Sequence, residues 1–304
     1  MLVVAALGGN ALLQRGEPLT AQVQRENVKV AARALAEIVK AGHQLVVTHG
    51  NGPQVGLLAL QAAAYNPDEI YPLDVLGAQT AGMIGYLVEQ ELENALQNER
   101  SIATLLTQVV VDRNDPAFQA PTKYIGPVYS QEEAHAKAEK AGWQIAQDGD
   151  KWRRVVASPK PLEIPDLQVI KLLVDQNVVV ICNGGGGIPV VRDGNNHLHG
   201  IEAVIDKDLS SAFLAKQLGA DALLLLTDVD AVYHGFGTPE ATPLSTLTVS
   251  ESDALNLPAG SMGPKINAAC SFADSGGFSA IGRLSEALGL LAGLAGTHIV
   301  KEHE

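Results

Sequence analysis

The sequence predicts an α/β fold in which helices cover both faces of a mainly parallel sheet. Through the first hundred residues, short apolar runs of strand length alternate with patterns of helical period, and this alternation is typical of parallel sheets. Aromatic residues make up only 4% of the chain, so the core must be built from Ala, Leu, Val and Ile. Such side chains suit buried parallel strands under alanine-rich helices. A length of 304 residues fits one large domain or two ordinary ones.

The first hundred residues predict three strands and three helices. Continuous apolar runs indicate strands at Leu2–Leu7 and over residues 45–48 and 104–111. Between them, one helix ends at Gly42, a second begins at Pro53, and a longer one spans residues 75–98. Their apolar stripes consist of Val28, Ala31, Leu35 and Ile38, then Val55, Leu58 and Ala62, then Ile84, Val88 and Leu92.

Residues 112–165 differ from the rest in composition, with six of the fifteen prolines and both tryptophans. Strand patterns over 143–147 and 150–156 flank Asp148-Gly149 and predict a hairpin with a primed turn. Long insertions in compact domains are usually either functional or disordered, and this one has strand signals. We therefore expect a lid over residues 112–165, with a minor core around Trp143 and Trp152, inserted in one domain that spans residues 1–304. The alternative is a long structured surface loop.

After the lid the alternation resumes. Strands are expected over 178–182, at Ala222–Thr227, over 279–281 and at Thr297–Val300. A four-glycine turn at 184–187 follows the first of these strands. Asp206 is expected to cap a helix that turns Leu209, Phe213 and Leu218 inward, and a further helix covers residues 264–274.

Composition excludes several classes of protein. The formal net charge is −13, the opposite of what a protein that coats nucleic acid needs. Cys182 and Cys270 have no zinc-like spacing and are expected to be small buried residues in a reducing cytoplasm. The N-terminal apolar run is shorter than that of a signal peptide, and no run is long enough to cross a bilayer. These observations favour a cytoplasmic location.

Three glycine turns follow predicted strands, at Gly8-Gly9-Asn10, at Gly50-Asn51-Gly52 and from Gly184 to Gly187. In an open parallel sheet such turns converge on one edge, where backbone N–H groups bind oxyanions. The P-loop pattern is absent, so a P-loop enzyme is excluded. A loose glycine pattern at 50–56 leaves a nicotinamide-dependent oxidoreductase as an alternative.

The positions of the lysines indicate which kind of ligand the glycine turns bind. Lys207 and Lys265 fall in the first turns of predicted helices, where a cation costs about 0.3–1 kcal/mol at an exposed site. A solvated surface tolerates this, but two such placements after strands suggest that an anion binds there. Asp208 is expected to hold these lysines apart while the site is empty. Lys123, bracketed by prolines in the lid, is either a surface lysine or a third cation of the site.

Histidines give weaker signals. His197 and His199 lie two residues apart in a polar loop, without the partner set of a metal site. His49 precedes a glycine turn and either orients it or is a satisfied structural residue. No constellation around a general base is visible. This fits phosphoryl transfer onto a group that is already anionic, because such chemistry needs positioning and charge neutralisation more than proton removal.

Short motifs in a fixed order cover nearly the whole chain. They read Leu-Gly-Gly-Asn-Ala at 7–11, His-Gly-Asn-Gly-Pro-Gln-Val-Gly at 49–56, Pro-Leu-Asp at 72–74, Pro-Thr-Lys at 121–123 with Ile-Gly-Pro at 125–127, Ser-Pro-Lys-Pro at 158–161, Gly-Gly-Gly-Gly-Ile-Pro-Val at 184–190, Glu-Ala-Val-Ile-Asp-Lys-Asp at 202–208 and Gly-Ser-Met-x-Pro-Lys at 260–265. Together they resemble the amino acid kinase superfamily and, within it, the carbamate kinase family.

The resemblance implies a three-layer αβα sandwich with a protruding lid and a homodimer. It also implies reversible phosphoryl transfer between carbamoyl phosphate and ADP, giving ATP and carbamate, with Mg²⁺ held mainly by the phosphates of ATP or ADP and not by protein ligands. The expected direction is toward ATP in nitrogen catabolism. By the same resemblance, the catalytic residues are Lys123, Lys207, Asp208 and Lys265. The phosphate- and carbamate-binding residues are Gly8, Gly9, Asn10, Gly50, Asn51, Gly52, Gly184 and Gly185. The nucleotide-binding residues are Lys207, Thr227, Asp228, Tyr233, Met262 and Lys265.

One detail favours carbamate as the acceptor. Acetylglutamate kinases share the resemblance but carry a lysine in the first strand, whereas the first lysine of this chain is Lys29. In carbamate kinases the lid lysine takes that role, which matches Lys123. The chain departs from the family pattern at Gly235, where the family usually has Asn, and in a long polar loop over 193–200. The alternatives are a nucleotide-binding regulator on the same fold without catalysis and a related kinase that forms another acyl phosphate.

Overall fold

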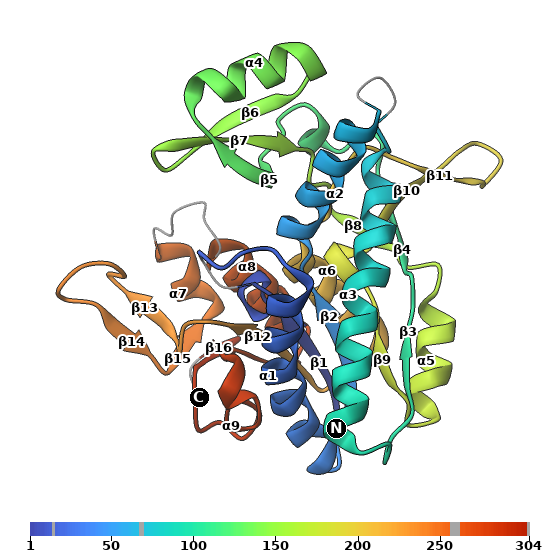
Figure 1. Cartoon of the computed structure of the whole chain (residues 1–304). Helices are drawn as coiled ribbons and strands as arrows, with labels where there is room; N and C mark the ends of the chain where they lie inside the picture. Colours follow the sequence, from blue (N-terminus) through green and yellow to red (C-terminus); the bar gives the residue numbers. More distant parts are fainter. Residues whose placement is uncertain (14–15, 67–69, 256–261, 303–304) are drawn as a thin grey trace.

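An eight-stranded sheet forms the centre of the molecule, in the order β15-β17-β16-β12-β1-β2-β9-β3 (Figure 1). The computed structural model describes all residues except 14–15, 67–69, 256–261 and 303–304. Neighbouring strands of this sheet run parallel, apart from the antiparallel pair β16 and β17. The strands are β1 (Leu2–Leu7), β2 (Gln44–His49), β3 (Ile102–Thr104), β9 (Val179–Ile181), β12 (Ala222–Thr227), β15 (Thr246–Thr248), β16 (Phe278–Arg283) and β17 (Thr297–Val300).

Strand β1 shows why helices cover both faces of this sheet. Its side chains alternate: Val3, Ala5 and Leu7 belong to one hydrophobic core, and Val4 and Ala6 belong to the other. The first core is closed by α1 (Ala21–Lys40), α3 (Leu73–Leu96) and α9 (Ala287–Leu291). The second is closed by α5 (Leu167–Asp175), α6 (Lys207–Leu218) and α8 (Met262–Asp274). The expected αβα sandwich is therefore confirmed, and both cores consist mainly of aliphatic residues.

Most sequence-based elements agree with the structure. The strands at Leu2–Leu7, Ala222–Thr227 and Thr297–Val300 have the expected bounds, and α2 (Gly52–Tyr65) has its proline in the first turn. The stripe of α1 is fully buried, which explains the length of that helix. Cys182 and Cys270 are buried, as expected.

The single strand expected over residues 104–111 is wrong. The chain forms β3 and then β4 (Gln108–Val111), which belong to different sheets. The break lies at residues 105–107, where Leu105 donates its N–H to the carbonyl of Ile181 and Thr107 accepts from Ile188. Leu106 between them is exposed. Because the break itself contains two leucines, the apolar run gives no sign of it.

A second sheet and one small hairpin extend from the main body. The sheet has the order β11-β10-β4-β8, with β8 (Pro161–Glu163), β10 (Ile188–Arg192) and β11 (Leu198–Gly200). The polar loop over 193–200 is therefore the tip of the β10–β11 hairpin together with β11. The hairpin pairs β13 (Val232–His234) with β14 (Thr242–Leu244), and α7 (Val249–Ala254) follows β15.

Within residues 112–165, a separate three-stranded antiparallel sheet stands apart from the central sheet (top of Figure 1). It has the order β5-β7-β6 and is covered by α4, with bounds β5 (Lys123–Tyr129), α4 (Gln131–Ala141), β6 (Gln144–Asp148) and β7 (Lys151–Val156). The hairpin of β6 and β7 confirms the sequence expectation, with Gly149 at φ +66° in its turn. Trp152 packs on His135 with ring centroids 5.3 Å apart, and Arg154 lies 4.9 Å from the ring of Trp143. We call these four elements the lid. β8, also within 112–165, belongs to the second sheet instead.

In the described part of the chain, the helices are too short or too polar to cross a membrane.

Candidate active site

A pocket of about 230 Å³ opens between the lid and the end of the central sheet. The turns after β1 and β2 and the first turn of α6 form its floor, and Lys123 to Ile125 of the lid form its roof. The lining residues are Gly9, Gly50, Asn51, Gly52, Pro53, Lys123, Tyr124, Ile125, Gly185, Val204, Ile205, Asp206, Lys207, Asp208, Pro264 and Lys265. The pocket thus lies where parallel strands end, the usual position of ligands in such sheets.

The three glycine turns lie close together at this edge. The N–H of Gly50 bonds to the carbonyl of Leu7 at 3.2 Å, which fixes the second turn against the first. A Cβ on Gly185 would lie only 2.2 Å from the side-chain nitrogen of Asn51, so only glycine lets the third turn approach the second. The Asn51 amide is held in turn by Thr80 Oγ1 at 2.8 Å. Glycine turns that meet in this way bring backbone close to the pocket, and N–H groups of such turns that are not bonded to a carbonyl can bind an oxyanion.

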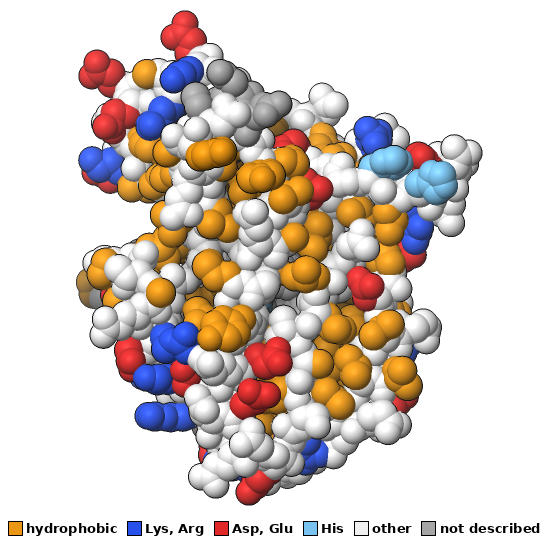
Figure 2. Space-filling model, turned by 45° about the vertical axis from the view of Figure 1, so that its right-hand side comes forward, with side chains coloured by type: hydrophobic (Ala, Val, Ile, Leu, Met, Phe, Trp, Pro, Cys, Tyr) orange, Lys and Arg blue, Asp and Glu red, His pale blue; other side chains and the backbone are white. Residues whose placement is uncertain are grey.

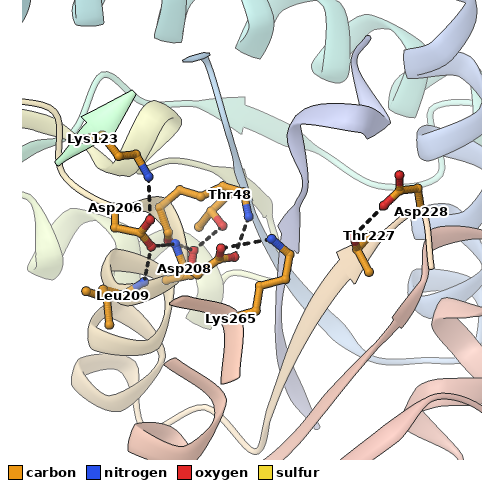
Figure 3. Close-up of polar contacts among 10 residues, drawn as sticks. Thr48, Lys123, Asp206, Asp208, Leu209, Thr227, Asp228 and Lys265 are labelled. Atoms are coloured by element: carbon orange, nitrogen blue, oxygen red, sulfur yellow. Dashed lines mark hydrogen bonds and ion pairs between the residues drawn. The ribbon is translucent and has the colours of Figure 1, made fainter. Parts of the chain in front are cut away.

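Two buried lysines share one carboxylate in the pocket (Figure 3). Lys207 Nζ lies 2.5 Å from Asp208 Oδ1, and Lys265 Nζ lies 3.2 Å from Asp208 Oδ2. Both lysines and Asp208 are nearly inaccessible to solvent. Burial lowers the pKa of the Lys207 ammonium, although the charge of Asp208 opposes this effect. The arrangement keeps two cations within reach of the same anion.

Asp206 explains how the lid lysine reaches the pocket. Its side chain caps α6 by accepting the N–H groups of Asp208 and Leu209 at 2.9 and 3.1 Å. Its other oxygen lies 2.5 Å from Lys123 Nζ (Figure 3). Burial alone would raise the pKa of Asp206, but the Lys123 ammonium and the α6 amides outweigh burial and lower this pKa to about 2. From sequence we expected the cap but not the ion pair. The sequence did offer one signal for this ion pair, since Asp206 directly precedes the predicted site residues Lys207 and Asp208.

The charge of the pocket differs in sign from that of the chain. Three ammonium groups, those of Lys123, Lys207 and Lys265, face two carboxylates, those of Asp206 and Asp208. One positive charge is left over, in a chain of net charge −13. At physiological salt, charges farther away than about 8 Å are largely screened, so the nearby lysines determine the local potential. The pocket therefore suits a small anion.

Buried hydroxyl groups hold the start of α6 in place. Ser211 Oγ lies 2.6 Å from Thr48 Oγ1 of β2 and donates to the carbonyl of Lys207, also at 2.6 Å. On the other side, Asn183 Nδ2 donates to Ser210 Oγ at 2.9 Å. These bonds tie the turn that carries Lys207 to the ends of two central strands. We missed them from sequence, because single Ser and Thr residues in a helix or strand carry no specific signal.

His49 lies behind the pocket. Its ring is buried, and its Nδ1 lies 3.0 Å from the carbonyl oxygen of Gly50. Burial lowers the pKa of His49 from 6.5 to about 4, despite the opposing hydrogen bond to Gly50. In the folded protein at pH 7, the His49 ring is therefore neutral. This favours a structural role, in which His49 fixes the turn at Gly50.

The lowered pKa of His49 predicts that acid destabilises the fold. Between pH 6.5 and 4 the unfolded chain binds a proton at His49 and the folded chain does not. The unfolding free energy therefore decreases as the pH is lowered. The loss is about 3 kcal/mol over this range. Urea unfolding at pH 7 and pH 4 measures the loss of unfolding free energy between these two pH values. This loss should be smaller by the same amount in His49→Gln than in the wild type. The exposed control His234→Gln should keep the wild-type profile, and a wild-type profile in His49→Gln would contradict the prediction.

Gly8 and Gly184 are not among the residues that line the pocket. Gly8 is next to the end of β12, and its N–H bonds to the carbonyl of Leu226. Asn10 lies in the short 3-10 helix Gly9–Ala11, and Gly184 is buried behind Gly185. The four residues expected only for the nucleotide lie at the end of β12, on β13 and at the start of α8: Thr227, Asp228, Tyr233 and Met262. Gly260 and Ser261 of the same motif fall outside the described residues.

Two of these nucleotide-side residues, Thr227 and Tyr233, contact a nearby aspartate. Thr227 ends β12 and donates to Asp228 Oδ1 at 3.0 Å (right of Figure 3). Tyr233 Oη lies 3.1 Å from both carboxylate oxygens of Asp230, and this hydrogen bond raises the pKa of Tyr233. Met262 begins α8, and Lys265 follows one turn later. Through α8, this region is therefore continuous with the lysine cluster.

Both histidines of the polar loop lie near Asp193. His199 Nε2 lies 2.9 Å from Asp193 Oδ2, and His197 Nδ1 lies 3.8 Å from the same oxygen. These side chains lie on the exposed β10–β11 hairpin of the second sheet, and none of them lines the pocket. No group of three or more His, Cys, Asp or Glu that could hold a metal ion was found where side chains are described.

Comparison with known proteins identifies the family. The sequence model of the amino acid kinase family matches residues 1–281. The chain belongs to the amino acid kinase family. A carbamate kinase of Rhizobium meliloti is 56% identical over 98% of this chain and 93% of the relative, and one of Haemophilus influenzae is 53% identical over 100% and 98%. The structure of carbamate kinase from Giardia lamblia bound to AMP-PNP is similar with a TM-score of 0.89 at 44% identity, covering 99% of this chain and 98% of that one. Within the amino acid kinases, this chain therefore groups with the carbamate kinases.

Proposed function

We propose that this amino acid kinase catalyses reversible phosphoryl transfer between carbamoyl phosphate and ADP. The observation that carries the proposal is the cluster of Lys123, Lys207 and Lys265 around two carboxylates, beside adjacent glycine turns. Identities of 53–56% to carbamate kinases over nearly the whole chain support the same substrates. The physiological direction that we propose is toward ATP, in nitrogen catabolism.

In this reaction a terminal oxygen of ADP forms a bond to the phosphorus of carbamoyl phosphate. The bond between that phosphorus and the carbamate oxygen breaks, and carbamate leaves with the electron pair. No proton has to be removed from the attacking oxygen, so the step needs positioning and charge stabilisation more than a general base. The pocket offers both, as cations and backbone amides that are fixed before the substrate arrives.

Each charged residue has a proposed part in this step. Lys207 and Lys265 neutralise the phosphates, and Asp208, which contacts both ammonium groups, keeps them oriented. Lys123 contributes a third cation from the lid and stays close to the phosphoryl group through its ion pair with Asp206. The turns at Gly8, Gly9 and Asn10 and at Gly50, Asn51 and Gly52 would bind the phosphoryl and carbamate groups. Gly185 would line the same site, with Gly184 behind it.

We propose that the nucleotide extends from the lysine cluster toward the β13–β14 hairpin. The relative from Giardia lamblia was solved with AMP-PNP, which supports an adenine nucleotide as ligand. Thr227, Asp228, Tyr233 and Met262 are the candidate contacts on that side, together with Lys207 and Lys265. Gly235, in the β13–β14 turn at φ +65°, stands where the family usually has Asn.

Magnesium would enter with the phosphates. Mg²⁺ is usually bound by one or two carboxylates together with phosphates and water, without a dedicated protein cage. The two carboxylates of the pocket already contact lysines, so this donor set fits a metal carried mainly by the nucleotide. When bound, Mg²⁺ would supply further neutralisation of phosphate charge.

The direct test is synthesis of ATP. Purified protein with carbamoyl phosphate, ADP and Mg²⁺ should produce ATP that luciferase detects, and omission of either substrate should abolish the signal. Acetyl phosphate and acetylglutamyl phosphate, offered in place of carbamoyl phosphate, distinguish a related acyl-phosphate kinase. Binding of ADP by folded protein without transfer from any of these donors would contradict the proposal and favour a non-catalytic regulator.

We also propose a homodimer in the cytoplasm. Tyr86 of α3 and the neighbouring Leu106, which lies against Gly82, are more than half exposed although both are large and apolar. Figure 2 looks toward the side that carries α3 and β3, and hydrophobic side chains spread over much of this face. Sedimentation should give twice 31.9 kDa, and a single-chain mass would contradict the dimer. Cys182 and Cys270 are both buried and are not joined in a disulfide, which is compatible with a reducing compartment.

A further inference from the structure

A contact between two glycines joins the lid to the main body. Helix α2 meets strand β5 at Gly56 and Gly126. A Cβ on Gly56 would lie 2.1 Å from the Cα and 2.7 Å from the backbone nitrogen of Gly126, whereas ordinary contacts of a Cβ are 3.4–4 Å. The two backbones therefore touch directly, with no room for even a methyl group between them.

The lid strand cannot easily move away from this contact. Gly126 lies at an irregularity of β5 between Ile125 and Val128, and its φ of +72° favours glycine. From the opposite strand, Arg153 Nε donates to the carbonyl oxygen of Gly126 at 2.7 Å. Gly126 is thus held between α2 on one side and β7 on the other.

The same strand carries Lys123, three residues before Gly126. Lys123 pairs with Val156 in the lid sheet, and its side chain leaves the sheet toward Asp206. A displacement of β5 at Gly126 would therefore be transmitted along a hydrogen-bonded strand to the lysine. Because α2 begins at Gly52, next to the glycine turn of the pocket, the contact also connects the floor of the site to its roof.

We propose that Gly56 is a positioning residue: its bare backbone seats the lid so that Lys123 reaches the phosphoryl group. The inference rests on the proposed function of Lys123. Helix stability gives no reason for this glycine, since glycine inside a helix is less favourable than alanine. Gly77 of α3 provides the contrast, because a Cβ there would meet nothing within 4 Å.

A double-mutant cycle tests this role. Gly56→Ala should lower kcat about 100-fold, the size of effect expected from a 1 Å misplacement of a catalytic group, and leave the KM for ADP unchanged. In the Lys123→Ala background the same change should lower kcat less than about 3-fold, because the group that it misplaces is already absent. The control Gly77→Ala should keep wild-type kcat and gain stability. Retention of wild-type kcat by Gly56→Ala, equal fold losses in both backgrounds, or wild-type kcat in Lys123→Ala would each overturn the proposal.

Fluorescence separates lid displacement from unfolding. Both tryptophans of the chain, Trp143 and Trp152, are in the lid, and Trp143 lines a small cavity with Gly56 and Gly126. Gly56→Ala should shift the tryptophan emission while the far-ultraviolet circular dichroism stays as in the wild type. Unchanged emission would overturn the proposal, and the emission can be measured without any enzymatic activity. Failure of the wild-type protein to make ATP would contradict the proposed function, and the emission would still decide whether Gly56 seats the lid.

Discussion

Replacement of Lys207 by alanine should lower kcat about 1000-fold and leave the fold intact. Lys207 supplies one of the three cations in the pocket, and loss of one preorganised donor to transition-state charge costs about 100- to 1000-fold in turnover. The larger value is expected because the side chain is buried, so that solvent screens its charge less than that of an exposed lysine. Lys265→Ala should behave in the same way, since it contacts the same carboxylate.

The stability of Lys207→Ala should change little, by about 1 kcal/mol or less. The lysine lies in the first turn of α6, where the helix dipole disfavours a cation, and burial disfavours its charge further. Its removal leaves Asp208 paired with Lys265. ATP synthesis and urea unfolding check the two effects side by side, with the exposed Lys216→Ala of the same helix as control. Near-normal kcat in both Lys207→Ala and Lys265→Ala would remove the argument for this site.

Secondary structure was predictable where burial is uniform. β1 and β12 are buried along nearly their whole length, so continuous apolar runs marked both. α1 was predictable because one stripe of it faces the core. The apolar run over 104–111 led to the wrong prediction of a single strand. Hydrophobicity indicates that a segment is buried, but not which sheet it joins. The hydrogen bonds at residues 105–107 make that choice, and they depend on partners more than 70 residues away.

The site was predictable as far as local pattern reaches. Glycine after a strand and lysine after a helix cap are both local signals, and both led to pocket residues. The ion pair of Lys123 with Asp206 joins residues 83 positions apart, and the bond of Thr48 to Ser211 joins residues 163 apart. No spacing rule connects such pairs, because their proximity depends on how the lid and α6 pack. The glycine contact of α2 with the lid has the same origin.

Asp208→Ala should destabilise the protein by about 3–5 kcal/mol in the absence of ligand, more than any other variant considered. The Asp208 carboxylate contacts two buried ammonium groups, and removal of one partner from a buried ion pair leaves an uncompensated charge. After the change, Asp206 is the one carboxylate that remains among the described residues lining the pocket. Asp274→Ala, an exposed change at the end of α8, serves as the control and should stay within about 0.5 kcal/mol of the wild type.

Phosphate should restore part of this loss, which separates charge repulsion from simple damage to packing. An anion that binds between Lys207 and Lys265 takes the place of the missing carboxylate and stabilises the folded state by mass action. Urea unfolding with and without inorganic phosphate should therefore show a larger gain for Asp208→Ala than for the wild type. Equal gains in both proteins would mean that the lysines do not depend on Asp208 for their charge balance. Asp208 would then act through packing and not through its charge.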